Sequence, residues 1–115
     1  MTEKLILEKI DNIAKITINN PSANTWDLES LAGLEEIIEH LNKDDGIFSL
    51  VITGQGEKFF SAGADLKVFQ EGGRDAAKEM SNASSKAFNS LSKFRGVSIA
   101  AINGFAMGGG LECAL

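Results

Sequence analysis

Two hydrophobic periods alternate along this chain of 115 residues, and their alternation constrains the fold more than any other feature. Leu5–Ile10 and Ile13–Ile18 are rich in β-branched residues and follow the two-residue period of strands. Asp11 and Asn12 separate the two runs, and both residue types tolerate positive φ, so the sequence predicts a tight β-hairpin. Residues 19–24 contain the only proline and are predicted to form a loop.

From residue 27 onward the period becomes that of an amphipathic helix. Asp27 is a suitable N-cap and Gly46 a suitable stop. A second helical pattern runs from Asp75 to about Phe94. The stripe of the first helix consists of Leu28, Leu31, Leu34, Ile37, Ile38 and Leu41, and that of the second of Ala77, Met80, Ser84, Ala87, Phe88 and Leu91.

Two short apolar runs, Phe48–Thr53 and Val97–Ile102, are predicted to be buried strands of the kind found in parallel sheets. A last helical pattern begins near Gly109. Strands therefore alternate with helices, which predicts an α/β fold. The sequence shows no internal repeat and no low-complexity linker.

The composition fits one small soluble domain, with 43% hydrophobic and 23% charged residues. The formal charge of −5 disfavours nucleic acid and anionic membranes as partners, although backbone N–H groups can still bind a small anion. There is one cysteine, and neither a signal-peptide pattern nor a run of roughly 18 apolar residues, so we expect a cytoplasmic protein. Residues 111–115 carry no helix stop signal, which predicts that residues 1–115 are the N-terminal part of a longer catalytic domain, cut inside a helix.

Two segments of small residues follow the predicted strands and are the candidates for chemistry. Ser61–Ala64 lets a ligand approach the backbone closely, and Gly63 permits a conformation that other residues resist. Gly108–Gly110 stands where a strand leads into a helix, and the first N–H groups of that helix favour a bound anion or a developing oxyanion. Glu112 follows Gly109 by three residues and so lies on the same helix face.

Common glycine motifs do not account for these segments. A dinucleotide fingerprint would need Gly or Ala where the chain has Cys113, and a phosphate loop would need Lys after Gly109. Taken alone, the glycines could instead mark close packing, and Glu112 could be a solvated helix residue.

Taken together, Phe60–Lys67 and Ala100–Glu112 strongly resemble the crotonase (enoyl-CoA hydratase/isomerase) superfamily. Ile16–Pro21, followed by Asn24, resembles the N-terminal strand and turn of that family, so the resemblance extends over the whole chain. It implies a crotonase-like spiral of strand–strand–helix repeats. It also implies an acyl-CoA thioester as substrate, no cofactor besides the coenzyme A of that substrate, and homotrimers or homohexamers of the full-length protein.

The resemblance also implies roles for individual residues. The N–H groups of Ala64 and Gly109 would hold the thioester oxygen, and Glu112 would be the first of the two glutamates that hydratases use. The second glutamate would lie beyond Leu115. The contacts to coenzyme A would come from Ala62, Ala64, Asp65 and Leu66, with Lys67 near the CoA end.

Two departures from the family pattern stand out. Ser22-Ala23-Asn24 lacks the basic residue that often assists the CoA phosphates, so phosphate affinity would rest on other lysines. Arg95-Gly96-Val97 replaces a common proline, which we expect to loosen the turn there.

Other residues with reactive or apolar side chains are expected to be structural. His40 is predicted to lie on the surface and Cys113 to be a buried thiol. Glu35, Glu36 and Glu39 are predicted to form a solvated helix face with no metal. Phe59, Phe60 and Met107 are candidates either for an acyl pocket or for the core.

The expected activity is that of an enoyl-CoA hydratase, a lyase of fatty-acid or related acyl-CoA metabolism. Glu112 favours this reaction, because an isomerase or a decarboxylase can dispense with an acid there. The alternatives are an enoyl-CoA isomerase, another crotonase-type enzyme, and a non-catalytic acyl-CoA-binding paralogue.

Overall fold

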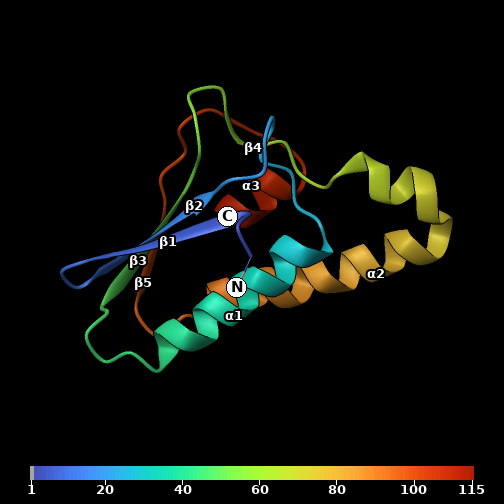
Figure 1. Cartoon of the computed structure of the whole chain (residues 1–115). Coiled ribbons are helices and arrows are strands. Elements are labelled where there is room, and N and C mark those ends of the chain that lie inside the picture. Colours follow the sequence, from blue (N-terminus) through green and yellow to red (C-terminus); the bar gives the residue numbers. More distant parts are fainter. Residues whose placement is uncertain (1) are drawn as a thin grey trace.

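The computed structural model describes residues 2–115, apart from the side chains of residues 68 and 69. Three units of strand, strand and helix follow one another along the chain (Figure 1). They are β1 (Leu5–Ile10), β2 (Ile13–Ile18) and α1 (Leu28–Asn42); β3 (Ser49–Gly54), β4 (Phe59–Ser61) and α2 (Leu66–Ser92); and β5 (Val97–Ala100), β6 (Phe105–Ala106) and α3 (Gly109–Ala114). The predicted α/β class and the repeating pattern are both confirmed.

The main sheet has the strand order β1-β2-β3-β5. β1 and β2 are antiparallel, with Leu5 opposite Ile18, whereas β3 runs parallel to both β2 and β5. Asp11 adopts a φ of 55° in the β1–β2 turn, which confirms the predicted hairpin. α1 and α2 lie side by side along one side of this sheet (Figure 1). The core contains residues from both the sheet and the helices, including Ile16, Ile52, Leu34, Ile37 and Met80.

α1 begins as the sequence predicts. The carboxylate of Asp27 accepts a hydrogen bond from the Ser30 N–H at 2.9 Å, and the Ser30 hydroxyl accepts one from the Asp27 N–H at 2.9 Å. This reciprocal capping satisfies two backbone donors that would otherwise lack partners. The helix ends at Asn42, before Gly46.

A second, small sheet joins β4 to β6 in parallel, and its strands were not predicted. Strands of three and two residues are too short to show a period in the sequence. An isolated parallel bridge between Trp26 and Ala64 extends this layer into the first unit. In all three units, therefore, the segment just before the helix lies in or beside this layer.

Two predicted elements differ from the structure. α2 begins at Leu66, nine residues before the predicted Asp75, and Gly73 interrupts it with a φ of 64°. The glycine pair at 72 and 73 obscures the helical period in the sequence. β5 is a strand, as predicted, and it pairs in parallel with β3, but its Val97 and Ile99 side chains are exposed rather than buried.

The turn before β5 is tied down rather than loosened, so that expectation is wrong. The guanidinium of Arg95 donates hydrogen bonds to the carbonyl oxygens of Leu41, Asn42, Asp44 and Ile47. The Arg95 N–H donates to Oδ1 of Asn42 at 3.1 Å. A single side chain thus connects the end of α1 to the start of the third unit.

Within residues 2–115, no helix is long and apolar enough to cross a membrane.

Candidate functional site

The two small-residue segments lie side by side because the second sheet brings them together. The Phe105 N–H donates to the Lys58 carbonyl at 2.9 Å, and the Met107 N–H donates to the Ser61 carbonyl at 3.0 Å. A Cβ built on Gly63 would lie 2.9 Å from the Gly109 nitrogen. A Cβ built on Gly109 would lie 3.6 Å from the Ala64 nitrogen. The N–H groups of residues 64 and 109 thus belong to turns in direct backbone contact.

Glycine is required where these turns approach. Gly63 has a φ of 98°, which side-chain-bearing residues rarely adopt. At Gly110, a Cβ would fall 2.1 Å from the Ser61 carbonyl oxygen. Close packing, the alternative considered for the glycine cluster, is therefore true of Gly110, and Gly63 packs just as closely. This packing holds the backbones of the two turns together.

A ladder of backbone hydrogen bonds fixes the first of these turns from the side of the first unit. The Ala62 N–H donates to the Ala23 carbonyl at 2.9 Å. The Trp26 N–H donates to the Gly63 carbonyl, and the Asp65 N–H donates to the Trp26 carbonyl, both at 2.8 Å. The Gly63 carbonyl and the Ala64 N–H belong to one trans peptide group, in which the C=O and the N–H point in opposite directions. The Ala64 N–H therefore points away from Trp26, and within residues 2–115 neither it nor the Gly109 N–H donates a backbone hydrogen bond.

Two asparagine side chains hold the loops that lead into the turns. Nδ2 of Asn24, which is buried, donates to the carbonyls of Gln55 and Phe59, both at 3.0 Å. Asn103 accepts from the Gly54 N–H at 3.0 Å and donates to the Gly54 carbonyl at 2.8 Å. The end of β3 is thus linked to both segments that form the candidate site.

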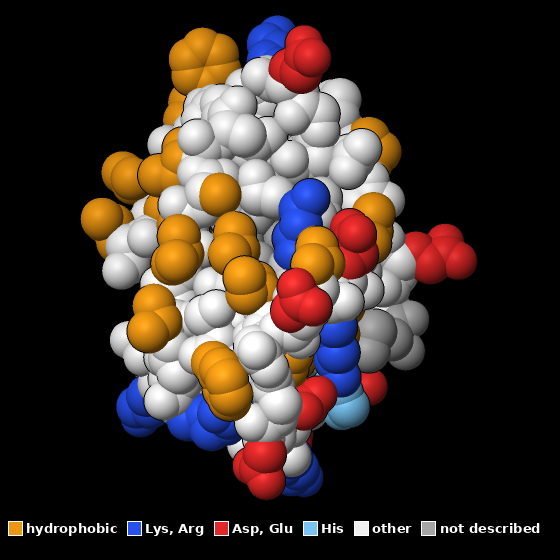
Figure 2. Space-filling model, turned by 90° about the vertical axis from the view of Figure 1, so that its left-hand side faces the viewer, with side chains coloured by type: hydrophobic (Ala, Val, Ile, Leu, Met, Phe, Trp, Pro, Cys, Tyr) orange, Lys and Arg blue, Asp and Glu red, His pale blue; other side chains and the backbone are white. Residues whose placement is uncertain are grey.

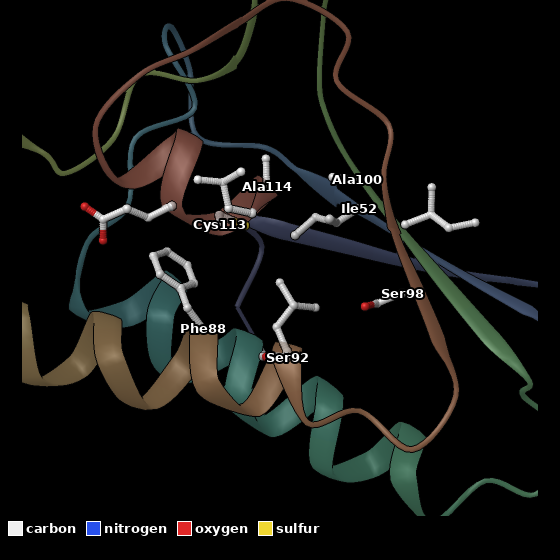
Figure 3. Close-up of a pocket in the computed structure, with 11 residues that line it drawn as sticks. Ile52, Phe88, Ser92, Ser98, Ala100, Cys113 and Ala114 are labelled. Atoms are coloured by element: carbon white, nitrogen blue, oxygen red, sulfur yellow. The ribbon is translucent and has the colours of Figure 1, made fainter.

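Glu112 lies one turn into α3, and its N–H donates to the Gly108 carbonyl at 3.1 Å. Its side chain is exposed, and the residue lines a cavity of about 110 Å³. Phe88 and Ser92 of α2, Ser98 and Ala100 of β5, and Cys113 and Ala114 of α3 surround the same cavity (Figure 3). Neither Ala64 nor Gly109 is among the residues that line it.

Cys113 is buried, as predicted, with 5% of its surface exposed. Burial raises the pKa of its thiol to about 12. The thiol therefore stays protonated at neutral pH and is a poor nucleophile.

The segment predicted to contact coenzyme A forms the start of α2. Asp65 is the N-cap of this helix and accepts a hydrogen bond from the Lys67 N–H at 3.0 Å. Ala62 and Ala64 are half-buried, whereas Leu66 and Lys67 are exposed. This edge of the molecule presents backbone and one ammonium group to solvent.

The remaining candidates separate into surface and core residues. His40 is exposed, with Nε2 3.1 Å from Nζ of Lys9. Phe60 is fully buried in the core, whereas Phe59 is half-buried and Met107 is exposed. Glu35 is half-buried, and Glu36 and Glu39 are exposed, as expected of a solvated helix face.

Sequence reasoning missed Trp26, which joins the first unit to the candidate site. The signal lies next to the predicted N-cap, because a large apolar residue just before an N-cap often packs against the helix it precedes. Trp26 and Leu31, the two positions of such a staple, are 1% and 0% exposed.

Comparison with known proteins agrees with this arrangement. The sequence profile of the enoyl-CoA hydratase/isomerase family matches residues 8–115. A crotonyl-CoA hydratase of Syntrophomonas wolfei is 37% identical over 114 residues, which are 98% of this chain and 44% of that protein. A short-chain-enoyl-CoA hydratase of Clostridium acetobutylicum is 36% identical over 112 residues, covering 96% of this chain and 43% of that protein.

Solved structures show the same fold. The structure of Pseudomonas aeruginosa DspI superposes with a TM-score of 0.95 and 63% identity, over 98% of this chain and 43% of that one. The chain thus spans less than half the length of the relatives and the solved structure that it matches. Over the length that it has, the chain belongs to the enoyl-CoA hydratase/isomerase family, the crotonase superfamily.

Proposed function

We propose that the full-length protein containing this chain is an enoyl-CoA hydratase, which adds water across the 2,3 double bond of an enoyl-CoA thioester. The observation that carries this proposal is the contact between the turns of Ala64 and Gly109, whose N–H groups make no backbone hydrogen bond within residues 2–115. Two relatives that are 36–37% identical carry the names of enoyl-CoA hydratases, which supports the same reaction.

The chemistry follows from the thioester carbonyl. Two N–H donors directed at its oxygen draw electron density from the conjugated double bond, so that C3 becomes electrophilic. The same donors stabilise the oxyanion that develops when water adds. Loss of one such donor costs about 3–4 kcal/mol of transition-state stabilisation in other enzymes. We assign this role to the N–H groups of Ala64 and Gly109.

We assign to Glu112 the task of holding and activating the water molecule. Its position on α3, one turn after Gly109, places it on the same element as one of the donors. The proton at C2 would be delivered by a second acid contributed by the remainder of the full-length protein.

The backbone of Ala62, Ala64, Asp65 and Leu66, with the ammonium group of Lys67, is proposed to bind the coenzyme A part of the substrate. No cofactor is needed, because the activating group is the thioester itself. Assembly as a homotrimer or homohexamer and a cytoplasmic location complete the proposal.

The test uses the full-length protein and a short trans-2-enoyl-CoA. Hydration removes the conjugated double bond, so the ultraviolet absorbance of the enoyl thioester falls. Glu112→Gln should lower kcat by orders of magnitude and leave acyl-CoA affinity nearly unchanged, because the carboxylate acts in the transition state. Glu36→Gln, an exposed position on α1, is the matched control and should retain wild-type kcat.

Wild-type turnover by the Glu112→Gln variant would contradict the assignment. A wild-type protein that interconverts 3-enoyl-CoA and 2-enoyl-CoA without hydrating either would favour the isomerase alternative. Binding of acyl-CoA with neither reaction would favour a non-catalytic paralogue.

A further inference from the structure

Trp26 occupies a distinctive place in the three-unit architecture. It directly precedes Asp27, the N-cap of α1, just as Ala64 directly precedes Asp65, the N-cap of α2. The two residues form a parallel bridge. Trp26 is therefore the counterpart of Ala64 in the first unit, and it lies beside the turn that carries the first N–H donor.

We propose that Trp26 is a positioning residue that fixes the orientation of the Ala64 N–H; this inference rests on the proposed oxyanion function. Both peptide groups that flank Ala64 are bonded to the backbone of Trp26, through the Gly63 carbonyl and the Asp65 N–H at 2.8 Å each. A rotation of the Ala64 peptide would break at least one of these bonds. The direction of the donor is thus set by the place of the Trp26 backbone.

The indole side chain in turn fixes that backbone. It is 1% exposed and meets the Phe88 ring of α2 edge to face, with the centroids 5.6 Å apart and an interplanar angle of 74°. Its Nε1–H has no hydrogen-bond acceptor among the described residues, so the contacts that these residues make with the ring are packing contacts. A large ring packed on α2 leaves little freedom to the main chain that carries it.

The expected consequence concerns kcat more than substrate binding. An oxyanion donor contributes most when charge develops on the oxygen, and its contribution depends on geometry. A side chain that only supplied core stability would alter melting temperature without separating kcat from KM.

The experiment compares Trp26→Ala and Trp26→Phe with Leu41→Ala in the full-length protein. Leu41 is a fully buried residue near the end of α1, far along that helix from Asp27, and controls for a loss of core volume. Rates are measured at a temperature at which circular dichroism shows every variant to be folded. Trp26→Ala should lower kcat by about 10- to 100-fold with KM changed by less than about 3-fold, since small misplacements of catalytic groups cost this much.

The conservative variant Trp26→Phe should retain most of the wild-type kcat. Phe at position 26 keeps an aromatic ring against Phe88, so Trp26→Phe should stay within about 5-fold of the wild-type kcat, and Leu41→Ala within about 3-fold. A second readout is independent of turnover: the infrared stretch of the ¹³C-labelled thioester carbonyl of bound butanoyl-CoA. Polarisation by the donors lowers this frequency, and the shift should be smaller in Trp26→Ala.

Each outcome decides between the two proposals. A carbonyl shift in the wild type that Trp26→Ala retains in full, together with wild-type kcat, would overturn the role of Trp26 and leave the proposed function standing. A loss of kcat in Leu41→Ala as large as that in Trp26→Ala would also overturn it, because core stability would then explain both. No carbonyl shift in the wild type would overturn the oxyanion function itself, and this inference with it.

Discussion

Single backbone atoms determine how closely the two turns of the candidate site approach each other. The Ser61 carbonyl fills the space that a side chain at Gly110 would need, and the Gly109 nitrogen and Met107 carbonyl fill the space beside Gly63. At this scale the two turns contribute main chain rather than reactive side chains. Their residue types are therefore small, and their function depends on where the fold places them.

The buried thiol next to Glu112 gives a prediction at the same scale. Because burial raises the pKa of Cys113 to about 12, almost no thiolate forms at pH 8. Cys113 in the native protein should therefore react with Ellman's reagent far more slowly than a free thiol, and should become reactive when urea unfolds the chain. Absorbance at the wavelength of the released thiolate follows both reactions. Rapid native reaction of this residue, located by peptide mapping, would contradict its burial.

The sequence was informative about some residues and silent about others for a physical reason. Asp27 and Cys113 were predicted because capping and burial are local properties of a helix and its apolar face. Trp26 and Arg95 were not, because their partners lie far away along the chain. The Gly63–Asp65 segment becomes a neighbour of Trp26 only when the units stack. The same stacking brings the carbonyls at and after the end of α1 beside Arg95.

At the scale of single elements, the start of α1 is held by charge as well as by capping. Nζ of Lys4 lies 2.5 Å from Oδ2 of Asp27, which joins β1's entry to the helix N-terminus. Burial raises the pKa of Asp27, but hydrogen bonds from Lys4 and Ser30 outweigh it and hold the pKa below 3.8. The hydrogen bond to Asp27 likewise raises the pKa of Lys4 above 10.5.

These shifts predict how stability depends on pH. A carboxyl with a lowered folded pKa stabilises the fold above its unfolded pKa, and this contribution is lost as the pH falls through 3.8 toward the folded pKa. Lys4 contributes below 10.5 and loses its contribution as the pH rises through its folded pKa.

Replacement of Asp27 by Asn keeps a good cap but removes the titration. The free energy of urea unfolding of Asp27→Asn should therefore fall less steeply between pH 6 and pH 3 than that of the wild type. Asp45→Asn, at an exposed position outside the helix, is the control and should follow the wild type. If the free energy of unfolding depended on pH in the same way for wild type and Asp27→Asn, the pKa of Asp27 would be the same in the folded and the unfolded state.

The junction between α1 and β5 gives a second prediction for an element. Arg95→Ala would remove a charged donor from four carbonyl groups near the end of α1. The carbonyls of Leu41 and Asp44 would keep the backbone N–H groups of Asp44 and Ile47 as donors, whereas those of Asn42 and Ile47 would lose their donor. We expect a loss of about 2 kcal/mol in the free energy of unfolding, in the range for hydrogen bonds from a charged group. Arg74→Ala, exposed on α2, should change stability little. Equal melting temperatures of Arg95→Ala and wild type would mean that water replaces the guanidinium without cost.

The elements themselves were predicted to different degrees. The hairpin, α1 and α3 carry clear periods or turn signals, and the structure has them. The early part of α2 was missed because Gly72 and Gly73 weaken the helical pattern, and β4 and β6 because they are too short. The exposure of the Val97 and Ile99 side chains could not be predicted. An apolar run shows that both faces of a strand are apolar, but it does not show which face other residues cover.

At the scale of the whole molecule, much apolar surface is exposed. Figure 2 shows hydrophobic side chains gathered over one face of the molecule. From β5 to residue 115, the exposed large apolar residues are Val97, Ile99, Ile102, Phe105, Met107, Leu111 and Leu115. Exposed apolar area of this extent favours association in water.

A polypeptide of residues 1–115 alone should therefore be poorly soluble, partly unfolded and inactive as a hydratase. Burying one such side chain is worth roughly 1.5–3 kcal/mol, a large part of the stability of a small domain. Size-exclusion chromatography, binding of an apolar dye and thermal melting test this expectation, with the longer protein proposed above as the reference. A monomeric 12.3 kDa species that melts cooperatively and hydrates enoyl-CoA would contradict it.

The overall topology was predicted from two sources. The α/β class follows from the alternating periods, whereas the repetition of strand, strand and helix was expected only from the family resemblance, because the sequence itself shows no internal repeat. Each unit meets different neighbours and so needs different side chains at equivalent positions. Trp26 in the first unit and Ala64 in the second illustrate this, since Trp26 is buried in the core and Ala64 is part of a turn of the candidate site.

The stacking of the three units has a consequence for the nascent chain. Trp26 bonds to the Gly63–Asp65 turn, and β4 of that second unit pairs with β6 of the third, so each unit is built on the one synthesised before it. The N-terminus of a nascent chain leaves the ribosome first. Each unit is therefore available before the later segment that pairs with it. The order of translation is thus also an order in which the main-chain donors of this molecule can be set in place.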